Sequence, residues 1–167
     1  MGKVEGRLAD QGLVLPPPLA VAATARLPFP MVRRLGSRLM ISGHGPQLVT
    51  GELSPVCGKV GAQVSLEEAY AAARLVALSM LGSIKRELGE LDRVIRWTRV
   101  FGMVNAAPGF NNLPAVINGF SDLILTLYGE ERGLHVRSAV GMASLPFDIP
   151  VEVEAEVEVE VWPGERA

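Results

Sequence analysis

The order of apolar and polar positions predicts two long helices among several short strands. The first helix begins after Ser65, because Ser65 and Glu68 form the S-x-x-E pattern of a capping box, in which each side chain satisfies a backbone amide. Apolar positions then recur on one face as far as the stop signal Gly89: Leu66, Ala69, Tyr70, Ala73, Val76, Ala77, Met80, Leu81, Ile84 and Leu88. This spacing predicts a helix with one continuous buried side.

A second helix is predicted from about Pro114 to Tyr128, with Gly129 as its stop signal. The residues expected on its buried side are Val116, Ile117, Phe120, Leu123, Ile124 and Leu127. A short helix is also expected over residues 3–11, where Val4 and Leu8 lie one turn apart.

Strand-like segments surround the two long helices. They are residues 37–43, 94–104, 134–143 and 151–161. A proline-interrupted apolar stretch over residues 20–34 suits a loop that leads into an edge strand. The order β-β-α-β-α-β-β predicts an α+β domain with two helices packed on one face of a mixed sheet. We assign residues 1–30 to an N-terminal extension, with a short helix and a proline-rich connection, and residues 31–162 to a single domain.

The composition narrows the class of protein. The chain has 167 residues, of which 49% are hydrophobic and 20% charged, as expected of one folded domain rather than a disordered chain. The net charge of -2, with no basic run longer than Arg33-Arg34, argues against a nucleic-acid binder. The single cysteine, Cys57, suits a reducing compartment, and no apolar run approaches the roughly 18 residues that suggest a membrane span. We therefore expect a cytoplasmic protein that does not enter a membrane.

An arginine interrupts the otherwise apolar strand over residues 134–143. Strand alternation places Leu134, Val136, Ser138, Val140 and Met142 on one face, and His135, Arg137, Ala139, Gly141 and Ala143 on the other. Arg137 thus shares its face with small residues that leave space beside it. Its guanidinium either anchors a carboxylate or phosphate in that space or pairs with a glutamate on the protein surface. The pattern alone favours the surface pair.

The last strand supplies many possible partners for such an arginine. Valine and alanine face one way, and five glutamates face the other: Glu152, Glu154, Glu156, Glu158 and Glu160. A row of carboxylates is repulsive unless cations lie beside it. We expect most of these residues to form a solvated face, and at most one or two to be functional.

Two further polar residues have both a structural and a functional interpretation. His44 lies in a turn between Gly43 and Gly45, where its backbone amide or its ring could reach a ligand, although an exposed loop residue is the default. Asn118 lies at the border of the second helix's apolar stripe and is either a hydrogen-bond anchor or a ligand contact. With two histidines and one cysteine, the chain has no metal-ligand spacing, and it has no nucleotide-binding glycine motif. We expect neither a metal nor a cofactor.

Three segments resemble the reactive-intermediate deaminase family, also called Rid or YjgF-like proteins. "RSAVGMASLPFDIPVEVEAEVEV" is similar to the family's closing pattern R-S-x-V-x-V-x-x-L-P-x-x-x-x-V-E-I-E-A. "ISGHGP" resembles its S-G-Q-x-P turn, and "VINGFSDLILTLYGE" its asparagine-bearing helix. The resemblance covers roughly residues 31–161 in the right order and is closest to a less-characterised branch.

The resemblance implies a chorismate-mutase-like fold assembled as a homotrimer, with ligand clefts between subunits. In the family's deaminases, which hydrolyse enamine and imine intermediates of amino acids to 2-keto acids, the motif arginine holds the substrate carboxylate. It falls on Arg137, and the glutamate that positions or activates water falls on Glu152. The pocket-lining turn falls on Ser42 and Gly43, and the helix asparagine on Asn118.

The chain departs from the family pattern at other pocket positions. Ala139 stands where the deaminases often have cysteine, and His44 where they have glutamine; "LPFPMV" replaces their G-P-Y-S motif. Three functions follow from the resemblance. They are a hydrolase of small imino or enamino acids, a non-catalytic trimer that binds a small carboxylate, and an endoribonuclease or translation inhibitor.

Overall fold

The computed structural model describes residues 2–20 and 27–161. Positions 21–26 of the predicted loop, and residue 162 at the end of the predicted domain, lie outside the described residues. The division into an extension over residues 1–30 and a domain over residues 31–162 stays a prediction.

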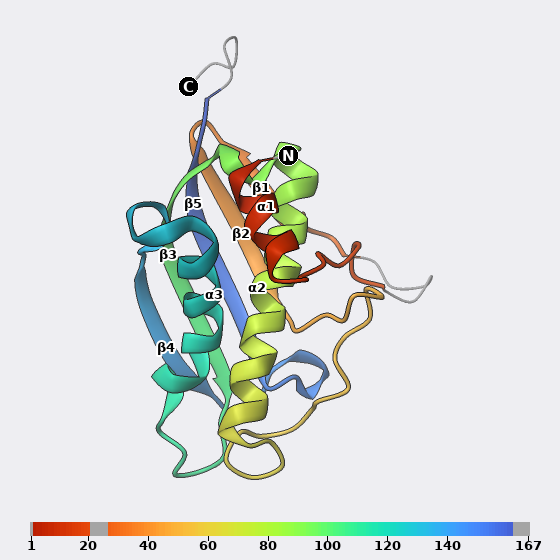
Figure 1. The fold of residues 1–167 in the computed structure, drawn as a ribbon. Helices are drawn as coiled ribbons and strands as arrows, with labels where there is room; N and C mark the ends of the chain where they lie inside the picture. The colour runs from red at the N-terminus through yellow and green to blue at the C-terminus, as the bar shows by residue number, and fades with distance from the viewer. Residues whose placement is uncertain (1, 21–26, 162–167) are drawn as a thin grey trace.

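One five-stranded sheet forms the centre of the protein (Figure 1). Its strands are β1 (Val32–Leu35), β2 (Arg38–His44), β3 (Val94–Asn105), β4 (Val136–Met142) and β5 (Val151–Val159), in the spatial order β1-β2-β5-β3-β4. β3 and β4 pair in parallel and every other neighbouring pair is antiparallel, so the predicted mixed sheet is confirmed. β4 and β1 are the two edges.

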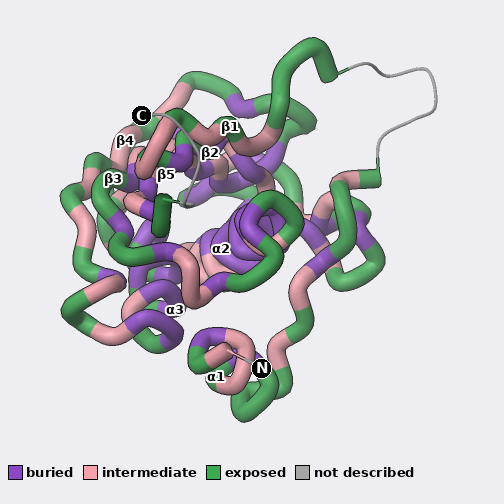
Figure 2. Tube along the Cα trace, turned by 90° about the horizontal axis from the view of Figure 1, so that it is seen from above, coloured by how far each residue is buried: buried purple, intermediate pink, exposed green. Residues whose placement is uncertain are grey.

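Two long helices, α2 (Leu66–Leu88) and α3 (Leu113–Gly133), cover one face of the sheet (Figure 1). Two short 3-10 turns connect other elements: η1 (Leu91–Arg93) joins α2 to β3, and η2 (Pro146–Asp148) joins β4 to β5. The short helix α1 (Lys3–Asp10) packs outside the two long helices, against α3 and η1 (Figure 2). The predicted capping box of α2 is present, with Ser65 Oγ 3.1 Å from the Glu68 amide and Glu68 Oε2 2.8 Å from the Ser65 amide. The predicted α+β fold with helices on one face is therefore confirmed.

The core lies between the helices and the sheet (Figure 2). The alternate residues Val151, Val153, Ala155, Val157 and Val159 of β5 are all buried there. Trp97 of β3 packs edge-on against Phe120 and Tyr128 of α3, at ring-centroid distances of 5.7 and 5.9 Å. Because strand side chains alternate, the glutamates of β5 must lie on the opposite face, which no described helix covers.

The N-terminal helix joins the same core. Val4 and Leu8 of α1 are buried, and the Val4 amide donates to Asp92 Oδ2 at 3.0 Å. Lys85 of α2 forms an ion pair of 2.8 Å with Glu5. The short apolar repeat at the N-terminus thus forms a helix because it packs on the domain.

The second long helix differs from its predicted end. Gly129 adopts φ 76°, a left-handed conformation that glycine reaches without strain, but the chain resumes helical geometry and α3 continues to Gly133. The glycine is a kink within α3 and not its stop. The kink redirects the last turn, so that Arg132 donates to the Val94 carbonyl oxygen, with Nη2 at 2.6 Å.

Replacing Ser65 by alanine removes one half of the capping box. We expect Ser65→Ala to lower the free energy of unfolding by about 1 kcal/mol, because the Glu68 amide loses its acceptor. Urea unfolding at one fixed protein concentration measures this change. The exposed Ser144→Ala serves as the control, and equal midpoints for the two variants would contradict the assigned cap.

Candidate functional site

Arg137 lies on the edge strand β4 and points to the helix side of the sheet. Its Nη1 donates to Asn118 Oδ1 and to Ser121 Oγ of α3, both at 3.0 Å, and its Nη2 lies 3.5 Å from the Pro114 carbonyl oxygen. No described carboxylate forms an ion pair with it. The surface pair with glutamate, which the pattern alone favours, is therefore wrong, and the space beside Arg137 is partly filled by α3.

A chain of hydrogen bonds continues from Arg137. Ser121 Oγ lies 2.9 Å from His135 Nε2, and His135 Nδ1 lies 2.7 Å from the Gly133 carbonyl oxygen. A carbonyl only accepts, so Nδ1 carries the proton, Nε2 accepts from the Ser121 hydroxyl, and that oxygen accepts from Arg137. Burial lowers the pKa of His135, and the charge of Arg137 lowers it further, which favours the neutral ring that this order requires. His135 is half-buried.

These contacts leave one edge of the guanidinium available. The Nε–H of Arg137 has no hydrogen-bond acceptor among the described residues, and Nη2 makes only the long contact to Pro114. Nε and Nη2 together form the fork that binds a carboxylate through two parallel hydrogen bonds. Ala139, two residues along the same face, is small and packs partly against the core. Asn118 and Ser121 thus hold the guanidinium while its binding edge stays free.

Glu152 differs from the other glutamates of its row. Four of the five are paired with arginines: Glu154 with Arg99 at 3.4 Å, Glu156 with Arg38 at 2.5 Å, Glu158 with Arg96 at 2.9 Å and Glu160 with Arg93 at 3.7 Å. Glu152 makes no ion pair or side-chain hydrogen bond with a described residue. Burial raises the pKa of the Glu152 carboxyl, and the negative charge of Glu154 raises it further. Its carboxylate is therefore a half-buried base without a partner in this chain.

Gly43 lies directly beneath the Glu152 carboxylate. A methyl group at Gly43 would overlap Glu152 Oε1, so only glycine leaves that carboxylate its present position. The adjacent Ser42 fixes the N-terminal segment through two hydrogen bonds. Its Oγ donates to the Pro30 carbonyl oxygen at 2.9 Å, and its amide donates to the Met31 carbonyl oxygen at 3.0 Å. Ser42, Gly43 and Glu152 thus form one cluster between β2 and β5.

His44 points the other way, into the helix layer. Its side chain is only 2% exposed, with Nδ1 2.7 Å from the Ser42 carbonyl oxygen and Nε2 2.9 Å from Ser83 Oγ of α2. Burial lowers the pKa of His44 to about 4, so the ring is neutral. The default interpretation of an exposed loop histidine is wrong, because β2 continues through His44 and a register shift between Ile41 and His44 breaks the strand alternation and turns the ring toward α2.

The two clusters lie on opposite faces of the sheet. Arg137 pairs with Val100 of β3, and Val100 pairs with Ala155 of β5, so these three residues lie in one row on the helix side. Glu152 is three residues from Ala155 and faces the uncovered side, with β3 between its strand and β4. One chain therefore cannot bring Arg137 and Glu152 to the same small ligand.

Within residues 2–20 and 27–161, no group of three or more histidine, cysteine, aspartate or glutamate side chains has the arrangement of a metal site. No helix in the same ranges is long and apolar enough to cross a membrane. Cys57 is a free, exposed thiol.

The fold has counterparts among known proteins. The family model described as "YjgF/chorismate mutase-like, putative endoribonuclease" matches residues 5–153. The chain belongs to this YjgF/chorismate-mutase-like family. Protein TCP17 of Trypanosoma cruzi is 41% identical over 151 residues, which are 90% of this chain and 91% of TCP17.

Two solved structures of similar length share the fold of this YjgF-like chain. The protein Atu1372 of Agrobacterium tumefaciens, described as having "unknown function", is 38% identical, with a TM-score of 0.84 over 95% of this chain and 93% of its own. A "putative endoribonuclease" from Shewanella oneidensis MR-1 is 32% identical, with a TM-score of 0.84 over 95% of this chain and all of its own. The resemblance to a less-characterised branch of the Rid or YjgF-like family is thus confirmed.

The unpaired Glu152 leads to a pH-dependent prediction. Its pKa is raised in the folded state, so its contribution to stability is greatest at acidic pH and is lost as the pH rises through the folded-state pKa. We expect Glu152→Gln to raise the unfolding midpoint near neutral pH, and the gain to shrink as the pH approaches the ordinary glutamate pKa of about 4.3. Thermal unfolding of both proteins across this range measures it, with the exposed Glu130→Gln as control. A gain that is independent of pH would contradict the assigned cause.

Proposed function

We propose that the protein is a homotrimeric, cytoplasmic hydrolase that deaminates reactive enamine and imine intermediates of amino acids to 2-keto acids, at clefts between subunits. The observation that carries this proposal is the separation of two unpaired groups, Arg137 and Glu152, on opposite faces of one sheet. Each group is held in place, and each lacks the partner that would neutralise it within the chain. A neighbouring copy can bring the two together.

The uncovered surfaces of the chain support association with further copies. β4 is an edge strand with unpaired backbone groups, and Leu134 and Val136 beside it are 61% and 70% exposed. Exposed apolar side chains at a strand edge are a typical interface. In a closed ring, the β4 edge of one subunit would lie against the uncovered sheet face of the next, which carries Glu152.

The chemistry assigned to each residue follows from its position. The free edge of Arg137 would bind the carboxylate of a substrate such as 2-iminobutanoate, with Asn118 holding the guanidinium and Ala139 leaving room beside it. Glu152 of the neighbouring subunit would pass one proton from water to the imine nitrogen as the water oxygen adds to the carbon. It would then pass the hydroxyl proton of the resulting carbinolamine to the same nitrogen as the C–N bond breaks. Imine and water then yield a 2-keto acid and ammonia.

The remaining predicted residues shape the cleft on the Glu152 side. Gly43 leaves room for the carboxylate, and Ser42 fixes the strand that carries it. His44 would contribute through its backbone, because both ring nitrogens are already bonded. The raised pKa of Glu152 makes it a stronger base than an exposed glutamate, as a general acid and base requires.

Mixed trimers test the shared site. Arg137→Met and Glu152→Gln should each abolish release of ammonia from 2-iminobutanoate generated in situ, because each removes one half of every site. Unfolding and refolding the two variants together should restore roughly a quarter of the wild-type rate, since random assembly gives that share of sites both native residues. Each variant refolded alone is the control.

Other outcomes separate the rival functions. No recovery in the mixture would contradict a shared site. Binding of 2-oxobutanoate that depends on Arg137, without turnover by the wild type, would identify a non-catalytic carboxylate binder. Cleavage of RNA that is lost in both variants, without imine turnover, would identify an endoribonuclease.

The hydrogen-bond chain behind Arg137 makes a separate prediction. We expect Ser121→Ala to raise KM for the imine by about five-fold or more, because Arg137 loses one of the two side-chain acceptors that hold it. The kcat should change little, since Ser121 does not touch the reacting atoms. Steady-state kinetics measure both constants. Thr126→Ala, whose hydroxyl bonds only within α3, is the control. A loss confined to kcat would contradict the positioning role.

A further inference from the structure

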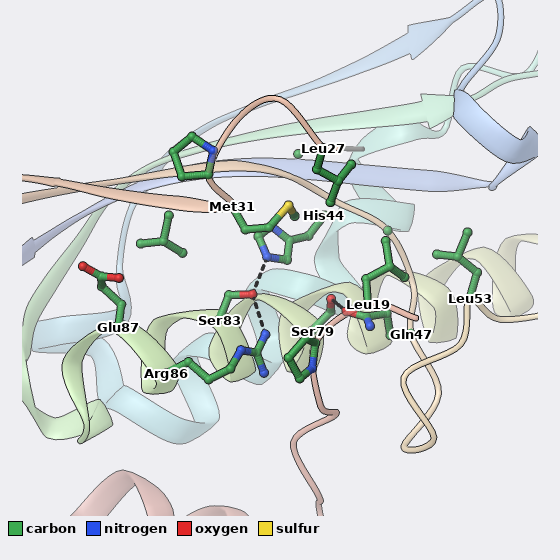
Figure 3. Close-up of a pocket in the computed structure, with 15 residues that line it drawn as sticks. Leu19, Leu27, Met31, His44, Gln47, Leu53, Ser79, Ser83, Arg86 and Glu87 are labelled. Atoms are coloured by element: carbon green, nitrogen blue, oxygen red, sulfur yellow. Dashed lines mark hydrogen bonds between the residues drawn. The ribbon is translucent and has the colours of Figure 1, made fainter. Parts of the chain in front are cut away.

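A second pocket lies between α2 and the strands β1 and β2, on the helix side of the sheet (Figure 3). Its volume is about 390 Å³, which is within the range of small-molecule sites. Gly43 and His44 contribute to its wall, but neither Arg137 nor Glu152 does. The pocket is therefore separate from the cleft proposed for imine hydrolysis.

The polar end of this pocket repeats the arrangement found at Arg137. Arg86 Nη2 donates to Ser83 Oγ at 2.9 Å, and Ser83 Oγ lies 2.9 Å from His44 Nε2 (Figure 3). Since His44 Nδ1 donates to the Ser42 carbonyl oxygen, Nε2 must accept from the serine, and the serine oxygen accepts from the arginine. Arginine, helix serine and histidine thus occur twice in the same order, with the serine on α2 in one case and on α3 in the other.

Arg86 also keeps a free binding edge. Its Nη1 donates to the Pro16 carbonyl oxygen at 3.1 Å, whereas its Nε has no acceptor among the described residues. It forms no ion pair with a described carboxylate, and the neighbouring Glu87 points away from it (Figure 3). A fixed guanidinium at the end of a concave pocket, without a counterion, is suited to one anionic group.

The remaining walls of the pocket determine which kind of molecule carries that anionic group. They are mainly apolar, and the side chains are Leu19, Leu27, Pro30, Met31, Val32 and Leu53. A single guanidinium, with Glu87 at the other side of the pocket, favours a ligand with one negative charge over a doubly charged phosphate. Apolar walls of this size stabilise a short aliphatic chain.

We propose that this pocket is a second ligand site, which binds an aliphatic carboxylate with its head on Arg86 and its chain against the apolar walls. The site goes beyond the proposed deamination and does not depend on it. Such a carboxylate has two chemical sources, a free aliphatic acid or an aliphatic amino acid whose ammonium group would face Glu87.

Titration calorimetry of the full chain with 4-methylpentanoate tests the proposal. We expect wild type and Arg74→Met to bind equally, and Arg86→Met to bind about ten-fold or more weakly, because it loses the charge-assisted contact. Arg74→Met is the matched control, since that arginine also lies on α2 but donates to Gln11 and does not line the pocket. 4-Methylpentan-1-ol should bind weakly to all three proteins, because it has the same chain without the charge.

A variant that fills the pocket with a larger side chain provides a second test of the site. Met31→Trp should abolish binding of both the acid and the alcohol, while its unfolding midpoint shows that the fold persists. If Arg86→Met fails to fold, Ser83→Ala replaces it, with a smaller loss of affinity. Tighter binding of L-leucine than of the acid, reversed by Glu87→Gln, would identify an amino acid as the occupant. No binding by the wild type, or equal binding by wild type and Arg86→Met, would overturn the proposal.

Discussion

The two-residue repeat of a β-strand is the constraint on which the candidate site depends. It sends Arg137 to the helix side of β4 and Glu152 to the uncovered side of β5, with β3 between the two strands. A shift of one residue in β5 would also turn its valines out of the core. The burial that stabilises the fold therefore also separates the two functional groups, and a working site requires a second chain.

The charges on the uncovered face follow from the same repeat. Four outward positions of β5, and Glu160 directly after the strand, are glutamates, and four of these five lie beside arginines that neutralise the row. Glu152, at the start of the strand, has no such arginine. An unpaired, half-buried carboxylate and a held but unpaired arginine each cost stability within one chain. Uncompensated groups of this kind are typical of functional sites, where a ligand or a partner completes them.

Local patterns predicted the parts of the fold that local chemistry controls. The capping box and spacing of α2, and the alternation of β5, depend on neighbours in sequence, so those elements were correct. The family resemblance supplied the functional roles of Arg137 and Glu152. Alternation alone placed Arg137 on one face of its strand and the five glutamates on one face of the last strand. Whether these residues meet depends on the order of the strands in the sheet, which is set by contacts between distant segments.

The missed features all involve such distant contacts. The Ser121–His135 pair forms because α3 continues past Gly129 and returns the chain to β4 beside Ser121. A glycine is an equally good signal for a helix end and for a kink, so the predicted stop at Gly129 was wrong. His44 lies between two glycines, which is typical of an exposed turn, yet Ser83 of α2 provides its hydrogen-bond partner inside the protein. A lone serine in a helix has no pattern that predicts such a contact.

A crystal structure of the protein with bound 2-oxobutanoate tests the central claim most directly. The account predicts a ring of three chains in which the ligand carboxylate lies on the Nε and Nη2 edge of Arg137, with its keto carbon facing Glu152 of the neighbouring subunit. A ligand held by Arg137 with no glutamate of a neighbouring chain near its keto carbon would contradict it.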